Sequence, residues 1–173
     1  MISSVLTGVR LAYAGRYPGR ALEMINRLGY VKEEHGNGEW TRTTMDDTGI
    51  CFGIAMMVKD VLKNNFNTPC EIVYIYRRYN AEEGDGFEDI LVHAVLWYDG
   101  KFYDSDDFTG VNKFEDLSYI RGFEGLGARM HYPSYPERGD TGSRDTIPNK
   151  ITPELHEIIE KTIGFRIPRR NVF

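Results

Sequence analysis

The sequence predicts an α+β fold in which one buried helix is followed by a run of antiparallel strands. Apolar residues cover nearly the whole circumference of a helix between Gly49 and Leu62. Densely apolar, β-branched residues then occupy 70–76, and the Asp99-Gly100 dipeptide favours a tight hairpin between two further strands. A helix that precedes strands joined by short turns is typical of α+β proteins.

The chain is long enough to bury the core of one domain. It has 173 residues, of which 41% are hydrophobic and 27% are charged, a balance typical of globular proteins. Because the sequence contains no internal repeat and no second domain, we predict a single domain over 1–173.

The first part of the chain, 1–48, is weakly patterned. Apolar residues at helical spacing predict a short helix over 20–28, after the turn signal Pro18-Gly19. Glycines predict a loop at 36–38, and Trp40 to Thr44 fit a short strand that leads toward the next helix.

The helix predicted from Gly49 to Leu62 is the strongest element and places Cys51 in its first turn. Asp47 or Thr48 can cap its N-terminus, and the polar run over 64–69 ends it. A helix that is apolar on all sides is normally buried through the middle of a domain.

The elements after this helix are predicted to be strands. The first covers Cys70 to Tyr76 and is followed by an acidic, glycine-rich loop over 80–89. Two more strands, Ile90 to Tyr98 and Lys101 to Asp104, flank the Asp99-Gly100 turn.

The C-terminal part is predicted to hold a loop and a helix. Residues 132–148 are rich in proline, glycine and polar side chains, which indicates a mobile loop. Thr152 can cap a helix from Pro153 to Thr162, because proline suits the first position of a helix.

Charge and composition argue against several partners. The net charge of −5 disfavours nucleic acid, and the C-terminal arginines (Arg166, Arg169, Arg170) fit a solvated tail. No apolar run approaches the roughly 18–20 residues of a membrane span, so no membrane is expected. Two cysteines are too few for a disulfide framework and no signal peptide is evident, so we expect a reduced, cytoplasmic protein.

Three residues could together make a cysteine nucleophilic. Cys51 lies at a predicted helix N-terminus, where backbone amides stabilise a thiolate. His93 opens a strand and can take the thiol proton, and a carboxylate on the returning strand can orient the imidazole.

The hairpin determines which carboxylates can reach His93. If Asp99-Gly100 forms the turn, Asp106 stands directly opposite His93, and Asp104 is its diagonal neighbour on the same face. The run 105–107 resembles a turn, in which strand pairing has already ended. We therefore predict that Asp104, rather than Asp106, orients His93.

Three motifs carry a resemblance to a known family. They are Gly49-Ile50-Cys51 at the helix start, His93-Ala94-Val95-Leu96 in the first hairpin strand, and Tyr103-Asp104 at the end of the second. In order and setting they resemble the papain-like cysteine hydrolase superfamily in its transglutaminase-like branch, over about residues 46–106. The resemblance implies a buried helix that carries the cysteine and packs on an antiparallel sheet.

The same resemblance implies a Cys51-His93-Asp104 triad that acts on amide or thioester bonds. Protease, deamidase, amidase and transglutaminase reactions share this machinery, and a protein or peptide substrate is expected. Papain-type enzymes place a glutamine before the cysteine for the oxyanion hole, whereas this chain has no glutamine. Trp40 or the Cys51 backbone amide can take that place.

The remaining candidate residues indicate no further site. His35 and His131 lack the spacing of zinc ligands, and the acidic loop 82–89 lacks the calcium-loop pattern. Gly122, Gly125 and Gly127 do not follow a strand as a phosphate cradle requires, so neither a metal nor a cofactor is expected. Cys70 follows a proline into an apolar strand and is predicted to be a core residue.

The alternative function is that of an inactive binding or scaffold protein with the same fold. Fold does not dictate activity, and tyrosine is favoured at interfaces. The C-terminal half is rich in aromatic residues that suit a partner surface (Phe108, Tyr119, Phe123, Tyr132, Tyr135). The sequence leaves the oligomeric state open.

Overall fold

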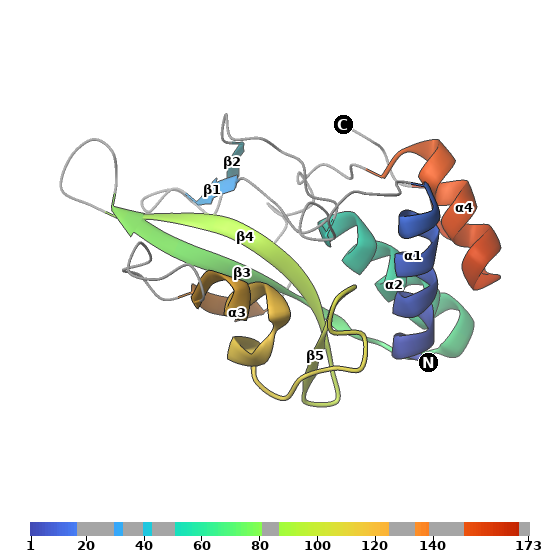
Figure 1. Cartoon of the computed structure of the whole chain (residues 1–173), viewed down its shortest axis with the longest axis horizontal. Helices are drawn as coiled ribbons and strands as arrows, with labels where there is room; N and C mark the ends of the chain where they lie inside the picture. The colour runs from blue at the N-terminus through green and yellow to red at the C-terminus, as the bar shows by residue number, and fades with distance from the viewer. Residues whose placement is uncertain are drawn as a thin grey trace.

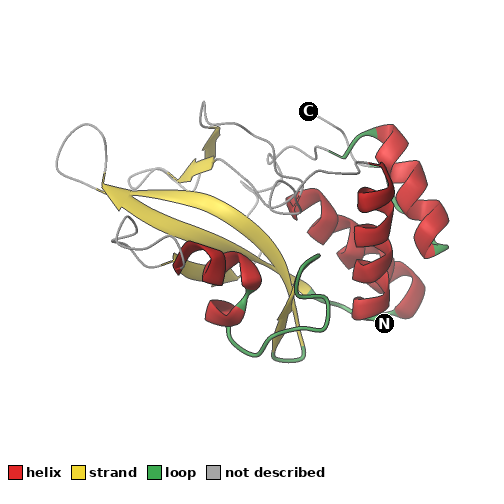
Figure 2. Cartoon of the chain, in the orientation of Figure 1, coloured by secondary structure: helices red, strands yellow, loops and turns green. Residues whose placement is uncertain are grey.

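The computed structural model describes residues 1–16, 30–32, 40–42, 51–80, 87–124, 134–138 and 151–169. These residues form an α+β fold, as predicted, in which helices pack against an antiparallel sheet (Figures 1 and 2). The predicted helix over 20–28, the loop at 36–38 and the capping residues Asp47 and Thr48 lie outside the described residues.

The sheet has six strands in the order β2-β1-β4-β3-β6, with β5 paired to β4, and every pairing is antiparallel. The strands are β1 (Tyr30–Lys32), β2 (Trp40–Arg42), β3 (Glu71–Asn80), β4 (Phe87–Tyr98), β5 (Lys101–Tyr103) and β6 (Ser134–Arg138). The long β3 and β4 form the centre of the sheet (Figure 1).

Helices cover both faces of the central strands. They are α1 (Ile2–Arg16), α2 (Cys51–Phe66), α3 (Ser118–Glu124) and α4 (Pro153–Ile163). The main core joins α1, α2 and α4 to one face, which includes Tyr74 and Leu96. A smaller core joins Leu117 and Ile120, beside and within α3, to alternate residues such as Val95 on the other face.

The predicted helix and hairpin are present with small changes in length. The helix α2 continues to Phe66 and ends where Asn67 adopts a positive φ of 47°, a conformation that asparagine tolerates. In the hairpin, Tyr98 pairs with Lys101 and Leu96 with Tyr103, which is the register expected from an Asp99-Gly100 turn. Thr152 caps α4 by accepting a hydrogen bond from the Leu155 amide.

One helix was not predicted from the sequence, and two of the expectations were wrong. The weakly patterned N-terminus contains α1, whose buried face packs against α2 and α4 and so stabilises a helix that its own pattern does not indicate. Residues 134–138 are a strand, β6, and not part of a loop, because they pair with β3. Phe87–Asp89 belong to β4 rather than to an acidic loop, since β3 and β4 pair out to Asn80 and Phe87.

The described strands cover one edge of β4 only in part. The strand β1 pairs with Asp89–Leu91 and β5 with Leu96–Tyr98, while β3 occupies the opposite edge. Among the described residues, no strand covers Val92–Val95 on the first edge. The register against β3 also shifts here, because His93 pairs with Ile75 and Leu91 with Tyr76, so Val92 is an extra residue in a β-bulge.

The contact between α1 and α4 makes a prediction about stability. A Cβ added at Gly8 lies 2.7 Å from Ile163 Cγ2, whereas one added at Gly15 meets nothing within 4 Å. We expect Gly8→Ala to lower the free energy of unfolding by about 1 kcal/mol, because the overlap outweighs the gain in helix propensity. Gly15→Ala, the matched control, is expected to leave this free energy unchanged or raise it slightly. Urea unfolding of both variants measures the difference, and equal values would contradict close packing at Gly8.

Candidate active site

Cys51 is the first residue of α2 and so lies in its first turn, where the sequence placed it. Its backbone amide is one of the first N–H groups of the helix, which have no partner inside the helix. The first turn contains no acidic residue, so nothing in that turn offsets the partial positive charge of the helix N-terminus. The side chain is buried, with 3% of its surface exposed.

His93 and Asp104 form a buried hydrogen bond. The distance from His93 Nε2 to Asp104 Oδ2 is 2.7 Å, and the two residues are 0% and 5% exposed. The other carboxylate oxygen, Oδ1, accepts hydrogen bonds from the backbone amides of Asp106 and Asp107 at 2.9 and 2.7 Å. Both oxygens of Asp104 are therefore engaged, which fixes the orientation of the carboxylate.

Asp104, and not Asp106, is the carboxylate that the structure places on the imidazole. The strand β5 ends at Tyr103, and the chain then turns around the Asp104 side chain. Asp106 does not continue the ladder, and its carboxylate lies 3.9 Å from Arg10 Nη1 on α1. Arg10 also contacts the Ser105 carbonyl at 3.4 Å, so α1 contributes to holding this turn.

The second ring nitrogen of His93 is left for Cys51. Nδ1 is buried and has no partner of strict hydrogen-bond geometry among the described residues. The Cys51 thiol is nevertheless near enough to the imidazole to raise its pKa. Since Asp104 occupies Nε2, we assign the interaction with Cys51 to Nδ1.

Burial and these two partners act on the pKa of His93 in opposite directions. Burial favours the neutral ring, but the hydrogen bonds and charges of Asp104 and Cys51 outweigh it and raise the pKa of His93 to about 10. Burial likewise opposes ionisation of Asp104, yet His93 and the two backbone amides lower the pKa of that carboxyl. At neutral pH the pair is therefore an imidazolium and a carboxylate.

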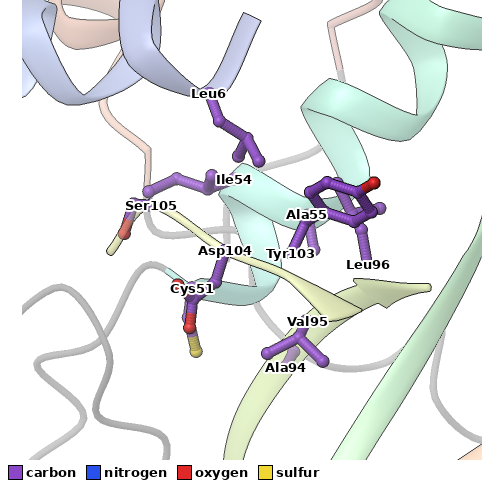
Figure 3. Close-up of a pocket in the computed structure, with 10 residues that line it drawn as sticks. All are labelled: Leu6, Cys51, Ile54, Ala55, Ala94, Val95, Leu96, Tyr103, Asp104 and Ser105. Carbon is purple, nitrogen blue, oxygen red and sulfur yellow. The ribbon is translucent and has the colours of Figure 1, made fainter. Parts of the chain in front are cut away.

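The three residues meet beside Val92–Val95 of β4, where no described strand covers the edge. Cys51 belongs to the main core on one face of the sheet, whereas His93 lies on the other face with Val95. A small pocket lies where α2 approaches this edge, and its lining includes Cys51, Ala94 and Asp104. Figure 3 shows the Cys51 sulfur directed away from Leu6 and Ile54, which line the same pocket. The pocket has room for about one water molecule.

Tyr119 is a part of this site that the sequence did not indicate. Its ring stacks on the imidazole of His93, with 4.4 Å between ring centroids and an angle of 24° between planes. Tyr119 lies 26 residues after His93 on α3, and nothing in the local pattern distinguishes it from other aromatic residues of the C-terminal half.

The other residues singled out from the sequence lie away from the site or outside the described residues. Cys70 is buried in the main core, as predicted. His35, His131 and 82–86 of the acidic loop lie outside the described residues, as do Gly125 and Gly127 and the side chain of Trp40. Within the described ranges, no group of three or more His, Cys, Asp or Glu residues can hold a metal ion.

Comparison with known proteins adds no assignment. No protein-family model matches the sequence, and no curated protein or solved structure matches it at a significant level. Among the helices in the described part of the chain, none has the length and hydrophobicity needed to cross a membrane.

The His93–Asp104 pair predicts how stability depends on pH. The folded-state pKa of His93, about 10, exceeds the ordinary value of 6.5, so its stabilisation is complete below pH 6.5 and is lost as the pH rises through 10. The pKa of Asp104 is lowered from 3.8, so its stabilisation is present above pH 3.8 and is lost as the pH falls. We expect the free-energy difference between the wild type and His93→Gln, measured by urea unfolding, to shrink from pH 6.5 to 10.

Histidine NMR provides the control for this prediction. Burial and the charge of Arg169 lower the pKa of His156, so its ring is expected to titrate below 6.5 while that of His93 stays protonated at pH 8. A His93 signal that titrates near 6.5, or a stability difference independent of pH, would contradict the ion pair.

Proposed function

We propose that this protein is a cysteine-dependent hydrolase or acyl transferase that acts on amide or thioester bonds through Cys51, His93 and Asp104. The observation that carries the proposal is the fully buried imidazole, which has Asp104 on Nε2 and lies close enough to Cys51 for the thiol to raise its pKa. A carboxylate on one ring nitrogen fixes the tautomer and leaves the other nitrogen to exchange a proton with the thiol.

The reaction starts from the form of the site in which the Cys51 proton is already on His93 Nδ1, so that the ring is an imidazolium. The sulfur adds to the substrate carbonyl carbon, and the electron pair of the carbonyl double bond moves to oxygen. When this intermediate collapses, the bond to the leaving nitrogen or sulfur breaks, and the imidazolium proton goes to the leaving group. Water then attacks the thioester on Cys51 while His93 accepts its proton, which releases the acid and restores the thiol. An amine in place of water gives acyl transfer.

The N-terminus of α2 can stabilise the oxygen anion formed during the attack. The Cys51 backbone amide is one of the first N–H groups of α2, which have no partner inside the helix, and the helix dipole places partial positive charge at the same end. Of the two oxyanion candidates from the sequence, Trp40 and the Cys51 amide, the amide is the one that lies within the described part of the site.

We further propose that the fold is of the papain/transglutaminase-like type and that the substrate is a protein or peptide. A cysteine at the start of a buried helix that packs on an antiparallel sheet supports the first. Amide chemistry supports the second, because polypeptides are the common source of amide bonds. Both cysteines are free thiols, which suits a cytoplasmic location.

A binding protein without activity is the second candidate, and burial of the site favours it. Cys51, His93 and Asp104 are all at most 5% exposed, so a substrate carbonyl can reach the sulfur only if the site opens. Two of the aromatic residues proposed for a partner surface make contacts inside the protein instead. Phe108 packs against the main core, and Tyr119 stacks on His93.

Alkylation separates the two candidates. We expect iodoacetamide at pH 7 to modify Cys51 at least about a hundredfold faster than Cys70. Burial raises the pKa of Cys70 to about 11, which leaves roughly one part in ten thousand as thiolate at pH 7. Mass spectrometry of peptides after timed quenching measures both rates.

The variants His93→Gln and Cys70→Ser serve as controls for this experiment. The first is expected to slow labelling of Cys51, and the second to leave it unchanged. Slow labelling of both thiols at similar rates would contradict the catalytic proposal and favour the binding protein.

Asp104 and Asp106 form a matched pair for testing the triad. We expect Asp104→Asn to reduce the rate of thiol acylation by p-nitrophenyl acetate by about 10³-fold or more, because the amide no longer fixes the tautomer or stabilises the imidazolium. Asp106→Asn keeps the backbone amide that bonds to Asp104 and is expected to change the rate less than about threefold. Nitrophenol absorbance gives both rates, and the reverse order would show that Asp106 orients His93.

A further inference from the structure

The ring plane of His93 is not fixed by its bond to Asp104 alone. Rotation about the second side-chain torsion of histidine has a broad energy profile, so one hydrogen bond at Nε2 leaves the direction of Nδ1 loosely defined. A contact with the flat face of the ring is needed to hold the plane. Tyr119 makes that contact, with its ring stacked 4.4 Å from the imidazole.

Tyr119 is in turn held in place by Asp107. The Asp107 carboxylate accepts hydrogen bonds from both the backbone amide and the hydroxyl of Ser118, each at 2.8 Å. Ser118 is the first residue of α3, and Tyr119 is the second. A helix of seven residues is marginal by itself, so its position depends on contacts such as this one.

Asp107 also contacts the residue that binds the imidazole. Its backbone amide donates to Asp104 Oδ1 at 2.7 Å, and Asp104 Oδ2 bonds to His93 Nε2. One residue therefore joins the in-plane partner of the ring to the helix that carries the stacked partner. These contacts form a closed ring, which runs from His93 through Asp104, Asp107, Ser118 and Tyr119 and back to His93.

We propose that Asp107, Ser118 and Tyr119 form a tether that sets the plane of the His93 imidazole and thereby directs Nδ1 at Cys51. All three are positioning residues, because they act on the thiol only through His93. Their effect on catalysis rests on the proposed function, whereas their effect on the imidazole does not.

The first experiment compares Asp107→Ala with Asp116→Ala. The first variant removes both acceptors for Ser118 but keeps the backbone amide that bonds to Asp104. The control removes an exposed ion pair with Arg121 next to the same helix and leaves the tether intact. We expect Asp107→Ala to slow alkylation of Cys51 about tenfold and to change its dependence on pH, and Asp116→Ala to change neither.

The second experiment tests the stacked ring. Tyr119→Leu removes the flat face and is expected to slow Cys51 alkylation about tenfold, whereas Tyr119→Phe keeps the ring and is expected to restore the rate to within about twofold. In ¹⁵N spectra the His93 titration of Tyr119→Leu is expected to move by about one pH unit or more toward that of an ordinary histidine. Rescue by phenylalanine and a shifted titration are not expected from a general loss of stability.

The outcomes of these experiments test the tether and the proposed function independently. If wild-type Cys51 is reactive but folded Asp107→Ala and Tyr119→Leu variants match it in rate and in His93 titration, the tether is wrong. If wild-type Cys51 is unreactive, the proposed function fails, and the His93 titration in the same variants still supports or overturns the tether. Circular dichroism establishes folding, and Ser118→Ala, which removes only the hydroxyl bond, replaces Asp107→Ala if that variant does not fold.

Discussion

The buried hydrogen bond between His93 and Asp104 is the contact on which the rest of the site depends. Either residue alone would be a polar group enclosed without a partner, which is strongly unfavourable, so the two stabilise each other in their charged forms. The bond also determines the direction of the chemistry. Because it occupies Nε2 and holds a proton on the ring, Nδ1 is the atom that remains for the thiol. The turn after β5 has its observed form because Asp104 Oδ1 accepts hydrogen bonds from the backbone amides of Asp106 and Asp107.

Sheet construction explains how residues from two different cores meet. A fully paired β4 would separate the face that carries His93 from the face against which α2 packs. Here β1 and β5 share one edge and leave Val92–Val95 uncovered by a described strand, so the N-terminus of α2 can approach at that position. The bulge at Val92 lies directly beside His93 and alters the local register against β3. Bulges are frequent next to functional sites for this reason, since they redirect one side chain without disturbing the distant ladder.

Much of this arrangement was predictable because it depends on local patterns. The hairpin register follows from a two-residue turn, and side-chain alternation then places His93 and Asp104 on one face. The helix that carries Cys51 is recognisable by its apolar circumference. Nothing local predicts α1 or β6, which depend on packing and pairing with elements far away in the chain. Tyr119 was missed for the same reason, because its contact with His93 depends on how Asp107 anchors a short helix that has little stability of its own.

The bulge in β4 affects how reliably the chain folds with the correct strand register. In a regular strand a slip by one position costs little backbone pairing yet turns every side chain to the opposite face. An extra residue at Val92 makes the two halves of β4 inequivalent, so only one alignment with β3 satisfies both halves. A chain that settled in another alignment could be compact and retain its helices while His93 pointed away from the thiol. A protein with the wrong β3–β4 register would therefore not be recognised by a measurement of helix content.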